Sequence, residues 1–334
     1  MINPIYSPNE ERYESGMSFR RCGKSGILLP QLSLGLWHNF GDVDSLANSF
    51  DMAHFAFDNG ITHFDLANNY GPSYGSAEET FGRIMEKSFK PYRDELFVST
   101  KAGHDMWPGP YGNWGSRKSL MASLDQSLKR MKLDYVDVFY SHRYDPETPL
   151  EETMQALVDI VRQGKALYVG ISKYPKEQAE QAYRYLDEHD VPCLVYQGRY
   201  NLFDRQPESN GVLAQAKQNG VGFIAFSPLA QGLLTDRYIN GVPTDSRMAQ
   251  NRFLKREVLT DAVMSKIVRL SEIATQRGQT LAEMSLAWLL KDDMVTSVII
   301  GASSVSQLER NLKALKNTTF TAEELSLIDE ICLG

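Results

Sequence analysis

Short apolar runs recur along the whole chain and alternate with segments whose apolar residues are spaced three and four positions apart. Near-continuous hydrophobicity over roughly four to eight residues is typical of strands covered on both faces, as in a parallel sheet. Spacings of three and four predict amphipathic helices. The expected strands cover residues 32–37, 63–67, 96–103, 136–142, 166–172, 193–197, 222–229 and 297–303.

Helices are expected between these strands, and glycine marks the end of several of them. Gly60, Gly164 and Gly220 each stand just before the next expected strand. Glycine is common there because many helices end in a left-handed residue, a conformation that glycine adopts easily. The clearest helical patterns cover residues 44–60, 116–132, 150–164 and 280–293.

Eight strand–helix units without a break in composition predict an α/β fold, a single (β/α)8 TIM barrel. The 334 residues are enough for such a barrel with insertions. An open doubly wound sheet is the alternative, since strand patterns alone do not show that a sheet closes; the missing glycine fingerprint in the first unit disfavours it. Residues 19–31 predict a short hairpin at the lower end of the barrel. We expect an N-terminal extension over residues 1–18 and one barrel domain over residues 19–334.

Composition and charge narrow the class of protein. The net charge of −7 argues against a nucleic-acid partner, which usually binds a basic surface. Cys22, Cys193 and Cys332 are far apart, so the sequence predicts neither a disulfide framework nor a metal site. The apolar runs are too short to span a bilayer, and the N-terminus lacks the pattern of a secretory signal. We therefore expect a cytoplasmic protein that does not contact membranes.

Polar or aromatic side chains stand at the end of every expected strand. In a parallel barrel all strands end at the same face, so these groups would converge in one site. The alternative is that each of them only satisfies the backbone of the following loop. The combination of a carboxylate, an ammonium group and an imidazole favours a catalytic site over this alternative. The strand-end residues are Trp37, Asp65, Lys101, His142, Ser172, Gln197, Ser227 and Ser303.

Asp65, Lys101 and His142, together with Tyr70, form a candidate acid–base set. The ordinary pKa of tyrosine, about 10, is too high for proton transfer at neutral pH, and the charge of Lys101 is expected to lower the pKa of Tyr70. Asp65 would hold Lys101, and His142 would donate a hydrogen bond to a substrate oxygen. A positioned proton donor beside a polarised carbonyl suits the reduction of an aldehyde or ketone.

The order of these four residues, in the contexts HFDLANNYG, STKAG and FYSHR, resembles the aldo-keto reductases. The likeness extends from about Phe19 onwards and includes GKALYVGIS, FSPLAQGLLT and IIGASSVSQLERN. It implies a barrel that binds NADPH or NADP+ without a Rossmann fold, and hydride transfer to a carbonyl with Tyr70 as proton donor. Within the family, the chain is most similar to the branch that reduces L-glyceraldehyde 3-phosphate and detoxifies methylglyoxal. That branch implies a homo-oligomer, a tetramer or an octamer.

The resemblance also implies a set of cofactor-binding residues. Ser172 and Gln197 would hold the nicotinamide carboxamide, and Phe226 would stack on the nicotinamide ring unless it is an ordinary core residue. Lys173 would reach a phosphate or be solvated. Arg310 would favour NADPH by contacting the 2′-phosphate, or would lie on a solvated helix face. The implied set is completed by Trp37 and Asp65, by Ser227, Leu229, Gln231, Arg237 and Arg247 near the pyrophosphate, and by Ser303, Gln307 and Asn311 at the adenosine end, spaced along one helix face.

Substrate-binding residues are expected around the same strand ends. A phosphorylated substrate would need a cation near the pocket, and Arg143 and Arg199 both follow strand ends. The alternative for each arginine is an ordinary surface salt bridge. The walls of the site are expected next to the candidate catalytic residues Tyr70 and His142, from Trp37, Trp107, Tyr111 and Trp114.

Two classes of function remain open. The first is an NADPH-dependent reductase of small aldehydes. The second is an NADPH-binding regulatory subunit that resembles the β subunits of voltage-gated potassium channels. His142 favours the enzyme, because the channel subunits carry asparagine at that position. A barrel hydrolase is excluded, since Asp65 is the only carboxylate at the expected strand ends.

Overall fold

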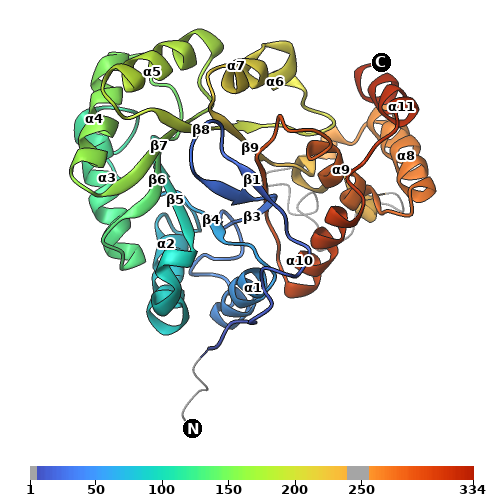
Figure 1. Cartoon of the computed structure of the whole chain (residues 1–334), viewed down its shortest axis with the longest axis horizontal. Coiled ribbons are helices and arrows are strands. Elements are labelled where there is room, and N and C mark those ends of the chain that lie inside the picture. The colour runs from blue at the N-terminus through green and yellow to red at the C-terminus, as the bar shows by residue number, and fades with distance from the viewer. Residues whose placement is uncertain (1–5, 239–255) are drawn as a thin grey trace.

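The computed structural model describes residues 6–238 and 256–334, which form a closed barrel of eight parallel strands. Neighbouring strands follow chain order, and the last strand pairs with both the first and the seventh. The helices form a ring around this barrel (Figure 1). The predicted TIM barrel is therefore confirmed, and the open sheet is excluded. Its strands are β3 (Leu32–Gly35), β4 (His63–Asp65), β5 (Phe97–Ala102), β6 (Val136–Ser141), β7 (Ala166–Ser172), β8 (Cys193–Arg199), β9 (Gly222–Phe226) and β10 (Ser297–Ile300).

All eight expected strands are present, although several are shorter than predicted. Strand β9 was expected to reach residue 229 and ends at Phe226. The next residue, Ser227, has a φ of 53°, a left-handed conformation that cannot continue a strand. The apolar residues that follow therefore belong to the loop, which lies at the candidate site.

The helices cover the outside of the barrel, as the periodicity of the sequence predicts. Among those in the described ranges, none has both the length and the apolar character needed to cross a bilayer. They are α1 (Leu46–Asp58), α2 (Ser76–Ile84), α3 (Arg117–Met131), α4 (Leu150–Arg162), α5 (Lys176–Glu188), α6 (Gln206–Ser209), α7 (Val212–Gln218), α8 (Asp261–Gln276), α9 (Leu281–Leu289), α10 (Val305–Leu312) and α11 (Ala322–Leu333), with short helical turns η1 (Met85–Phe89), η2 (Lys90–Glu95), η3 (Ala230–Gly232), η4 (Asp236–Tyr238), η5 (Arg256–Val258) and η6 (Lys313–Lys316).

The predicted glycine stops follow three of these helices. Gly60, Gly164 and Gly220 have φ values of 80°, 70° and 68° after α1, α4 and α7. Helix α3 ends without glycine, because Lys132 itself adopts a φ of 57°. Each left-handed residue turns the chain from the outer helix back towards the next strand.

The predicted N-terminal hairpin is present and lies across one end of the barrel (Figure 1). Its strands are β1 (Phe19–Arg21) and β2 (Leu28–Pro30), paired antiparallel. Cys22 and Leu29 are fully buried and join a small apolar cluster with barrel residues such as Val138 and Ile224. The hairpin thus covers the lower end of the barrel, opposite the carboxyl ends of the strands.

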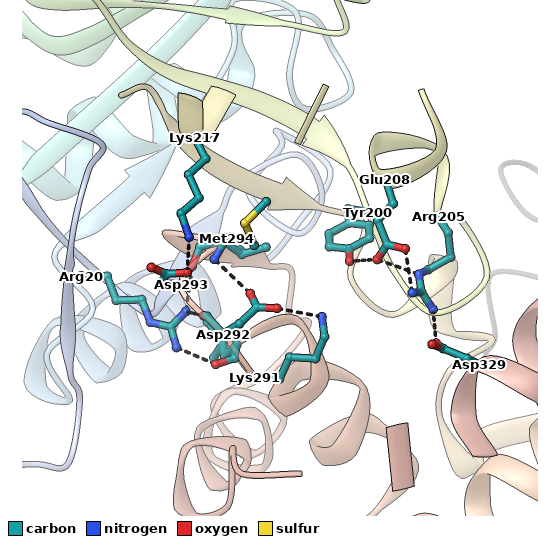
Figure 2. Close-up of polar contacts among 12 residues, drawn as sticks. Arg20, Tyr200, Arg205, Glu208, Lys217, Lys291, Asp292, Asp293, Met294 and Asp329 are labelled. Atoms are coloured by element: carbon teal, nitrogen blue, oxygen red, sulfur yellow. Dashed lines mark hydrogen bonds and ion pairs between the residues drawn. The ribbon is translucent and has the colours of Figure 1, made fainter. Parts of the chain in front are cut away.

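Arg20 fastens this hairpin to the loop between α9 and β10. Its guanidinium group donates to the carbonyl oxygens of Leu290, Asp292 and Val295, at 2.5 Å for Leu290 and 2.8 Å for Val295. Figure 2 shows Arg20 against this loop. Leu290 is the C-cap of α9, and Asp292 and Val295 lie in the loop beyond it, so the arginine satisfies one carbonyl at the helix end and two in the following loop.

A second charged group ties the C-terminal helix to the barrel. Arg205 pairs with Glu208 at 2.7 Å and with Asp329 of α11 at 2.9 Å. Tyr200, just after β8, donates its hydroxyl to the same glutamate (Figure 2). The guanidinium group also lies 4.5 Å from the ring centre of buried Trp288. Helices α6 and α11 are therefore held together beside the carboxyl end of β8.

Residues 6–18 precede the hairpin and lie along α1 and η2. The ring of Tyr6 stacks on His54 at 3.9 Å, and its hydroxyl donates to Asp58 at 2.8 Å. Arg12 pairs with Glu95 at 2.6 Å. This segment thus follows the outer surface of the barrel before the chain reaches β1.

Replacing Arg20 with alanine is expected to lower the free energy of unfolding by about 2 kcal/mol, since several carbonyl groups lose their donor. Chemical denaturation followed by circular dichroism measures the change. The matched control is Arg21→Ala, because Arg21 is exposed and, among the described residues, its guanidinium bonds only the carbonyl of Ser25. Equal destabilisation by the two variants would contradict this assignment to Arg20.

Candidate active site

The parallel barrel brings the predicted strand-end residues to one face. Asp65 ends β4, Lys101 lies near the end of β5, and His142 directly follows β6. Ser172 ends β7, and Gln197 lies near the end of β8. Residues separated by more than one hundred positions therefore surround one region at the carboxyl ends of the strands. This is where barrel enzymes place their catalytic groups.

The centre of this region is an ion pair between Lys101 and Asp65. Their side chains are 0% and 3% exposed, and Nζ lies 2.6 Å from Oδ2. Nζ also donates to the carbonyl oxygen of Leu66 at 2.6 Å. The hydroxyl of Tyr70 lies 3.5 Å from Nζ. The structure thus brings three of the four candidate catalytic residues together. As expected from the sequence, Asp65 contacts Lys101, and Lys101 lies beside Tyr70.

The second carboxylate oxygen of Asp65 also has donors. Oδ1 accepts from the hydroxyl of Ser99 at 2.8 Å and from Nε2 of Gln197 at 3.0 Å. A buried ion pair is tolerated only when its remaining polar atoms are satisfied, and here both oxygens are. Ser99 was not predicted from the sequence. The strand period of two was an available signal, because it places Ser99 and Lys101 on the same face of β5.

Glu78 of α2 is a further buried charge that the sequence did not reveal. It accepts from the hydroxyl of Thr100 at 2.6 Å and pairs with Arg130 at 2.8 Å. Its negative charge raises the pKa of Lys101, as Asp65 does, against the larger effect of burial, which lowers that pKa. No sequence signal was available, because helical periodicity does not show which glutamate turns inward.

The predicted direction of the pKa shift of Tyr70 is wrong. Burial raises the pKa of Tyr70 well above its ordinary value, and the negative charge of Asp65 raises it further. The lysine ammonium lies at the outer limit of hydrogen bonding from the phenol and is already engaged by the carboxylate. Tyr70 is therefore a protonated phenol at neutral pH, the form that can donate a proton.

His142 is held as a neutral imidazole beside the phenol. Its ring centre lies 6.0 Å from that of Tyr70 and 4.5 Å from that of His104. Burial lowers the pKa of His142 well below its ordinary value, and the charges of Lys173 and Lys101 lower it further. Its Nδ1 is buried without a hydrogen-bond partner among the described residues. A neutral imidazole has one N–H that can be donated to a carbonyl oxygen.

Arg143 is fixed at the mouth of the region. Its Nε donates to the carbonyl of Gly103 at 2.9 Å, and Nη2 donates to the side chain of Asn113 at 2.8 Å. The guanidinium group lies 3.6 Å from the ring centre of Trp114. All three of these partners are uncharged, and the nearby carboxylates Asp105 and Asp145 oppose the lowering of the Arg143 pKa by burial without forming an ion pair with it among the described residues.

Lys173 adds a second cation on the same side. Its Nζ lies 3.3 Å from Nε2 of His104 and 5.6 Å from the ring centre of Phe226. Desolvation and the charges of Lys101 and Arg143 lower the pKa of Lys173 to about 8. The ion pairs formed within residues 6–238 and 256–334 include neither Lys173 nor Arg143. His104 was not expected at this site, and no sequence signal pointed to it.

The remaining predicted substrate residues differ in their surroundings. Trp37 is 37% exposed, and its ring centre lies 6.4 Å from that of Tyr70. Trp107 lies in the loop after β5, in a turn closed by the Met106–Gly112 backbone bond. Arg199 forms an ion pair with Asp204 at 3.1 Å, and its side chain is 53% exposed. Its charge is thus compensated by a direct ion pair, which Arg143 does not form among the described residues.

Two predicted cofactor residues carry buried polar atoms without partners. The hydroxyl of Ser172 and Nδ2 of Asn311 have no hydrogen-bond partner among the described residues, although their side chains are 0% and 3% exposed. A buried polar group in this state is costly unless a ligand satisfies it. Both positions were assigned to opposite ends of a dinucleotide. The residues present therefore fit a nicotinamide cofactor.

The backbone of the predicted cofactor segments is strained. Lys173, Ser227, Ala230 and Gln231 have positive φ values of 57°, 53°, 47° and 62°. Residues other than glycine rarely adopt this conformation, and such strain gathers at binding sites. Leu229 lies within the same turn, which ends in η3. The strained backbone of the loop after β9 therefore indicates a binding site rather than a simple connection between elements.

The residues predicted for the adenosine end lie just before and along α10, but one prediction needs correction. Ser303 lies before the helix, whose N-cap is Ser304, so it does not share the helix face with Gln307 and Asn311. Instead, Oε1 of Gln307 accepts from the backbone N–H of Ser303 at 2.9 Å. Arg310 is exposed. Arg237 lies in η4, and Arg247 falls outside the described residues.

Comparisons with known proteins agree with this geometry. Residues 31–332 match the family described as the aldo/keto reductase family. The chain is 57% identical over 330 residues to the L-glyceraldehyde 3-phosphate reductase of Escherichia coli K12, covering 98% of this chain and 95% of that protein. It is also 37% identical over 306 residues to a probable voltage-gated potassium channel subunit beta of Arabidopsis thaliana, covering 90% and 91%. The matched region contains the whole candidate site.

Replacing Lys101 with methionine is expected to lower the free energy of unfolding by about 3 kcal/mol, because Asp65 is left as an unpaired buried charge. Adding Asp65→Asn to this variant should recover part of the loss. Denaturant titration of the single and double variants measures the coupling. The control Lys132→Met breaks an exposed pair with Glu86 and should cost far less, because solvent screens that pair. Purely additive effects at positions 65 and 101 would show that the pair is not coupled.

Proposed function

Because the chain belongs to the aldo/keto reductase family and is an oxidoreductase that acts on carbonyl groups, we propose that it reduces small aldehydes with NADPH. The proposed substrates are L-glyceraldehyde 3-phosphate and methylglyoxal. The observation that carries the proposal is the protonated phenol of Tyr70 beside the buried Lys101–Asp65 pair. The family resemblance further supports a homo-oligomer, a tetramer or an octamer, that works in the cytoplasm.

In the proposed mechanism the protein supplies the proton and positions the carbonyl. The nicotinamide cofactor, when bound, supplies a hydride. Tyr70 donates its phenolic proton to the carbonyl oxygen, and Lys101 stabilises the phenolate that remains, at 3.5 Å in the structure. Asp65 keeps Lys101 charged and in place. His142, as a neutral imidazole, orients the carbonyl by donating its N–H.

The proposed cofactor site is supported by two observations. Ser172 and Asn311 carry buried polar atoms without partners among the described residues, and the loop after β9 has a strained backbone. Ser172 would hold the nicotinamide end, together with Gln197, whose Nε2 is already engaged by Asp65. Phe226 is half-buried and available for stacking at the end of β9. Asn311 would take the adenosine end, and exposed Arg310 beside it supports a preference for the 2′-phosphate of NADPH.

The proposed phosphorylated substrate is supported by the charges at the mouth of the site. Arg143 and Lys173 both lie close enough to His142 to lower its pKa and lack ion-pair partners among the described residues, so a phosphate would relieve their mutual repulsion. Arg199 is the weaker candidate, because Asp204 already pairs with it. The name of the E. coli relative supports the same substrate class.

The second candidate function is an NADPH-binding regulatory subunit, which the similarity to the channel subunit keeps open. His142 favours the enzyme, since a subunit that only reports on its cofactor needs no group to polarise a carbonyl. Cofactor binding without turnover on any aldehyde would establish the regulatory function instead.

Replacing Tyr70 with phenylalanine is expected to lower kcat by at least about 100-fold, because the proton donor is removed, while NADPH binding persists. The test is NADPH consumption with L-glyceraldehyde 3-phosphate, its D-isomer and methylglyoxal, beside a fluorescence titration of the cofactor. Fast and L-selective turnover that Tyr70→Phe loses would support both the chemistry and the substrate. Normal turnover by this variant would rule out Tyr70 as the donor.

A pH dependence is expected for phosphorylated substrates alone. Lys173 carries its charge below a pH of about 8 and loses it above, so KM for L-glyceraldehyde 3-phosphate should rise as the pH passes that value. KM for uncharged methylglyoxal should stay level. Steady-state kinetics between pH 6 and pH 10 would measure both.

Lys173→Gln should remove this difference between the two substrates, whereas Lys176→Gln, at the start of α5, should leave it unchanged. A pH-dependent KM that persists in Lys173→Gln would assign phosphate recognition to another group.

A further inference from the structure

A continuous chain of polar groups within hydrogen-bond distance of one another runs from the carboxylate of Asp65 through the interior of the barrel to the hairpin at its lower end. Its members come from β4, β5, β3 and β10 and from the end of β2, and the side chains involved are all buried. None of the roles assigned above uses the lower part of this chain. In order, the members are Asp65, Ser99, His63, Ser33, Ser297 and the carbonyl group of Pro30.

Each neighbouring pair lies within hydrogen-bond distance. Ser99 Oγ lies 2.8 Å from Asp65 Oδ1 and 3.0 Å from His63 Nε2. On the other side of the imidazole, Nδ1 lies 2.8 Å from Ser33 Oγ. The hydroxyl of Ser33 is 2.6 Å from that of Ser297, which in turn lies 2.6 Å from the Pro30 carbonyl.

The position of each proton follows from the carboxylate. Asp65 is paired with the ammonium of Lys101 at 2.6 Å, so it is ionised and can only accept. The single hydroxyl proton of Ser99 must therefore point to Asp65. Ser99 Oγ then has only lone pairs for His63, so Nε2 of the imidazole must carry a proton and donate it.

The rest of the chain is satisfied with a neutral imidazole. Burial lowers the pKa of His63 to about 4, with a further contribution from Lys101 that Asp65 opposes. With its one proton on Nε2, Nδ1 accepts from the hydroxyl of Ser33. Ser297 has a single proton, which it donates either to the Pro30 carbonyl or to Ser33, so only one of these two contacts is a hydrogen bond at a time.

We propose that His63 is a positioning residue of the active site, which acts by holding the hydroxyl of Ser99 on Asp65. Its Nε2–H donates to the oxygen of Ser99. The hydroxyl proton of Ser99 then has the carboxylate of Asp65 as its acceptor. The carboxylate then stays ionised and aligned against Lys101, which stabilises Tyr70. This inference deepens the proposed reductase function and depends on it for its effect on catalysis.

The physical consequence concerns the acidic side of the pH profile. A carboxylate that loses a donated hydrogen bond takes up a proton more readily, because hydrogen bonds to the charged form favour that form. Once Asp65 is protonated, the ion pair with Lys101 is lost and turnover falls. The other titratable and charged groups that face this cluster are Tyr70, Tyr140, Glu78 and His142.

Two matched serine variants test the proposal in the full-length protein. Ser99 and Ser33 are both fully buried and contact opposite nitrogens of the same imidazole. Ser99→Ala should move the acidic limb of kcat/KM to higher pH by about one pH unit. Ser33→Ala should lose stability but keep the wild-type limb, and Ser99→Thr, which retains the hydroxyl, should restore the wild-type profile.

Equal shifts in Ser99→Ala and Ser33→Ala, or no shift in either, would overturn the proposal. A shift confined to Ser99→Ala and reversed in Ser99→Thr would support it, because general loosening of the core would affect both serine positions alike.

The protonation of His63 can be measured independently of turnover. Nitrogen NMR of the folded protein with labelled histidine reports which ring nitrogen carries the proton, and His63→Gln identifies the signal. A proton on Nε2 that exchanges slowly with water is the expected result. A proton on Nδ1 alone would overturn the inference. Because this readout needs no substrate, it would decide the role of His63 even if the proposed reduction of aldehydes were not observed.

Discussion

The buried ion pair between Lys101 and Asp65 is the interaction on which the candidate site depends. Two charges removed from water are stable only if each remaining lone pair and proton finds a partner. Those partners come from β5, from β8 and from the turn after β4, through Ser99, Gln197 and the Leu66 carbonyl. The pair can therefore form only when the barrel has closed, which makes the site a product of the whole sheet.

Burial shifts the pKa values of Tyr70 and His142, the two groups beside this pair, in opposite directions. As a result both groups are neutral. Burial raises the pKa of Tyr70 and lowers the pKa of His142, so that a phenol and an uncharged imidazole face the same region. The positive charges lie further out, on Arg143 and Lys173. The site thus has neutral hydrogen-bond donors inside and cations at its mouth, an arrangement suited to a small carbonyl compound that carries an anionic group.

The errors of sequence-based prediction have physical causes at particular residues. The charge of Lys101 was expected to lower the pKa of Tyr70, but the extent of burial and the alignment of the ammonium with Asp65 reverse that effect. Ser303 was placed on a helix face by its spacing from Gln307, yet the helix begins only after Ser304. His63 looked like part of a buried strand, and its bonds to Ser33 and Ser99 depend on strands that are distant in sequence.

By itself, the sequence determined the eight strands, the glycine ends of helices, the hairpin and the identity of the candidate catalytic residues. These follow from local periodicity, from backbone preferences and from the order of residues at strand ends. Only the tertiary structure decided which polar atoms are satisfied, which have no partner within residues 6–238 and 256–334, as in Ser172 and Asn311, and in which direction each pKa moves. The physical reason is that hydrogen bonds and desolvation at this site depend on atoms from strands far apart in the chain. Barrel closure alone brings them within a few ångströms.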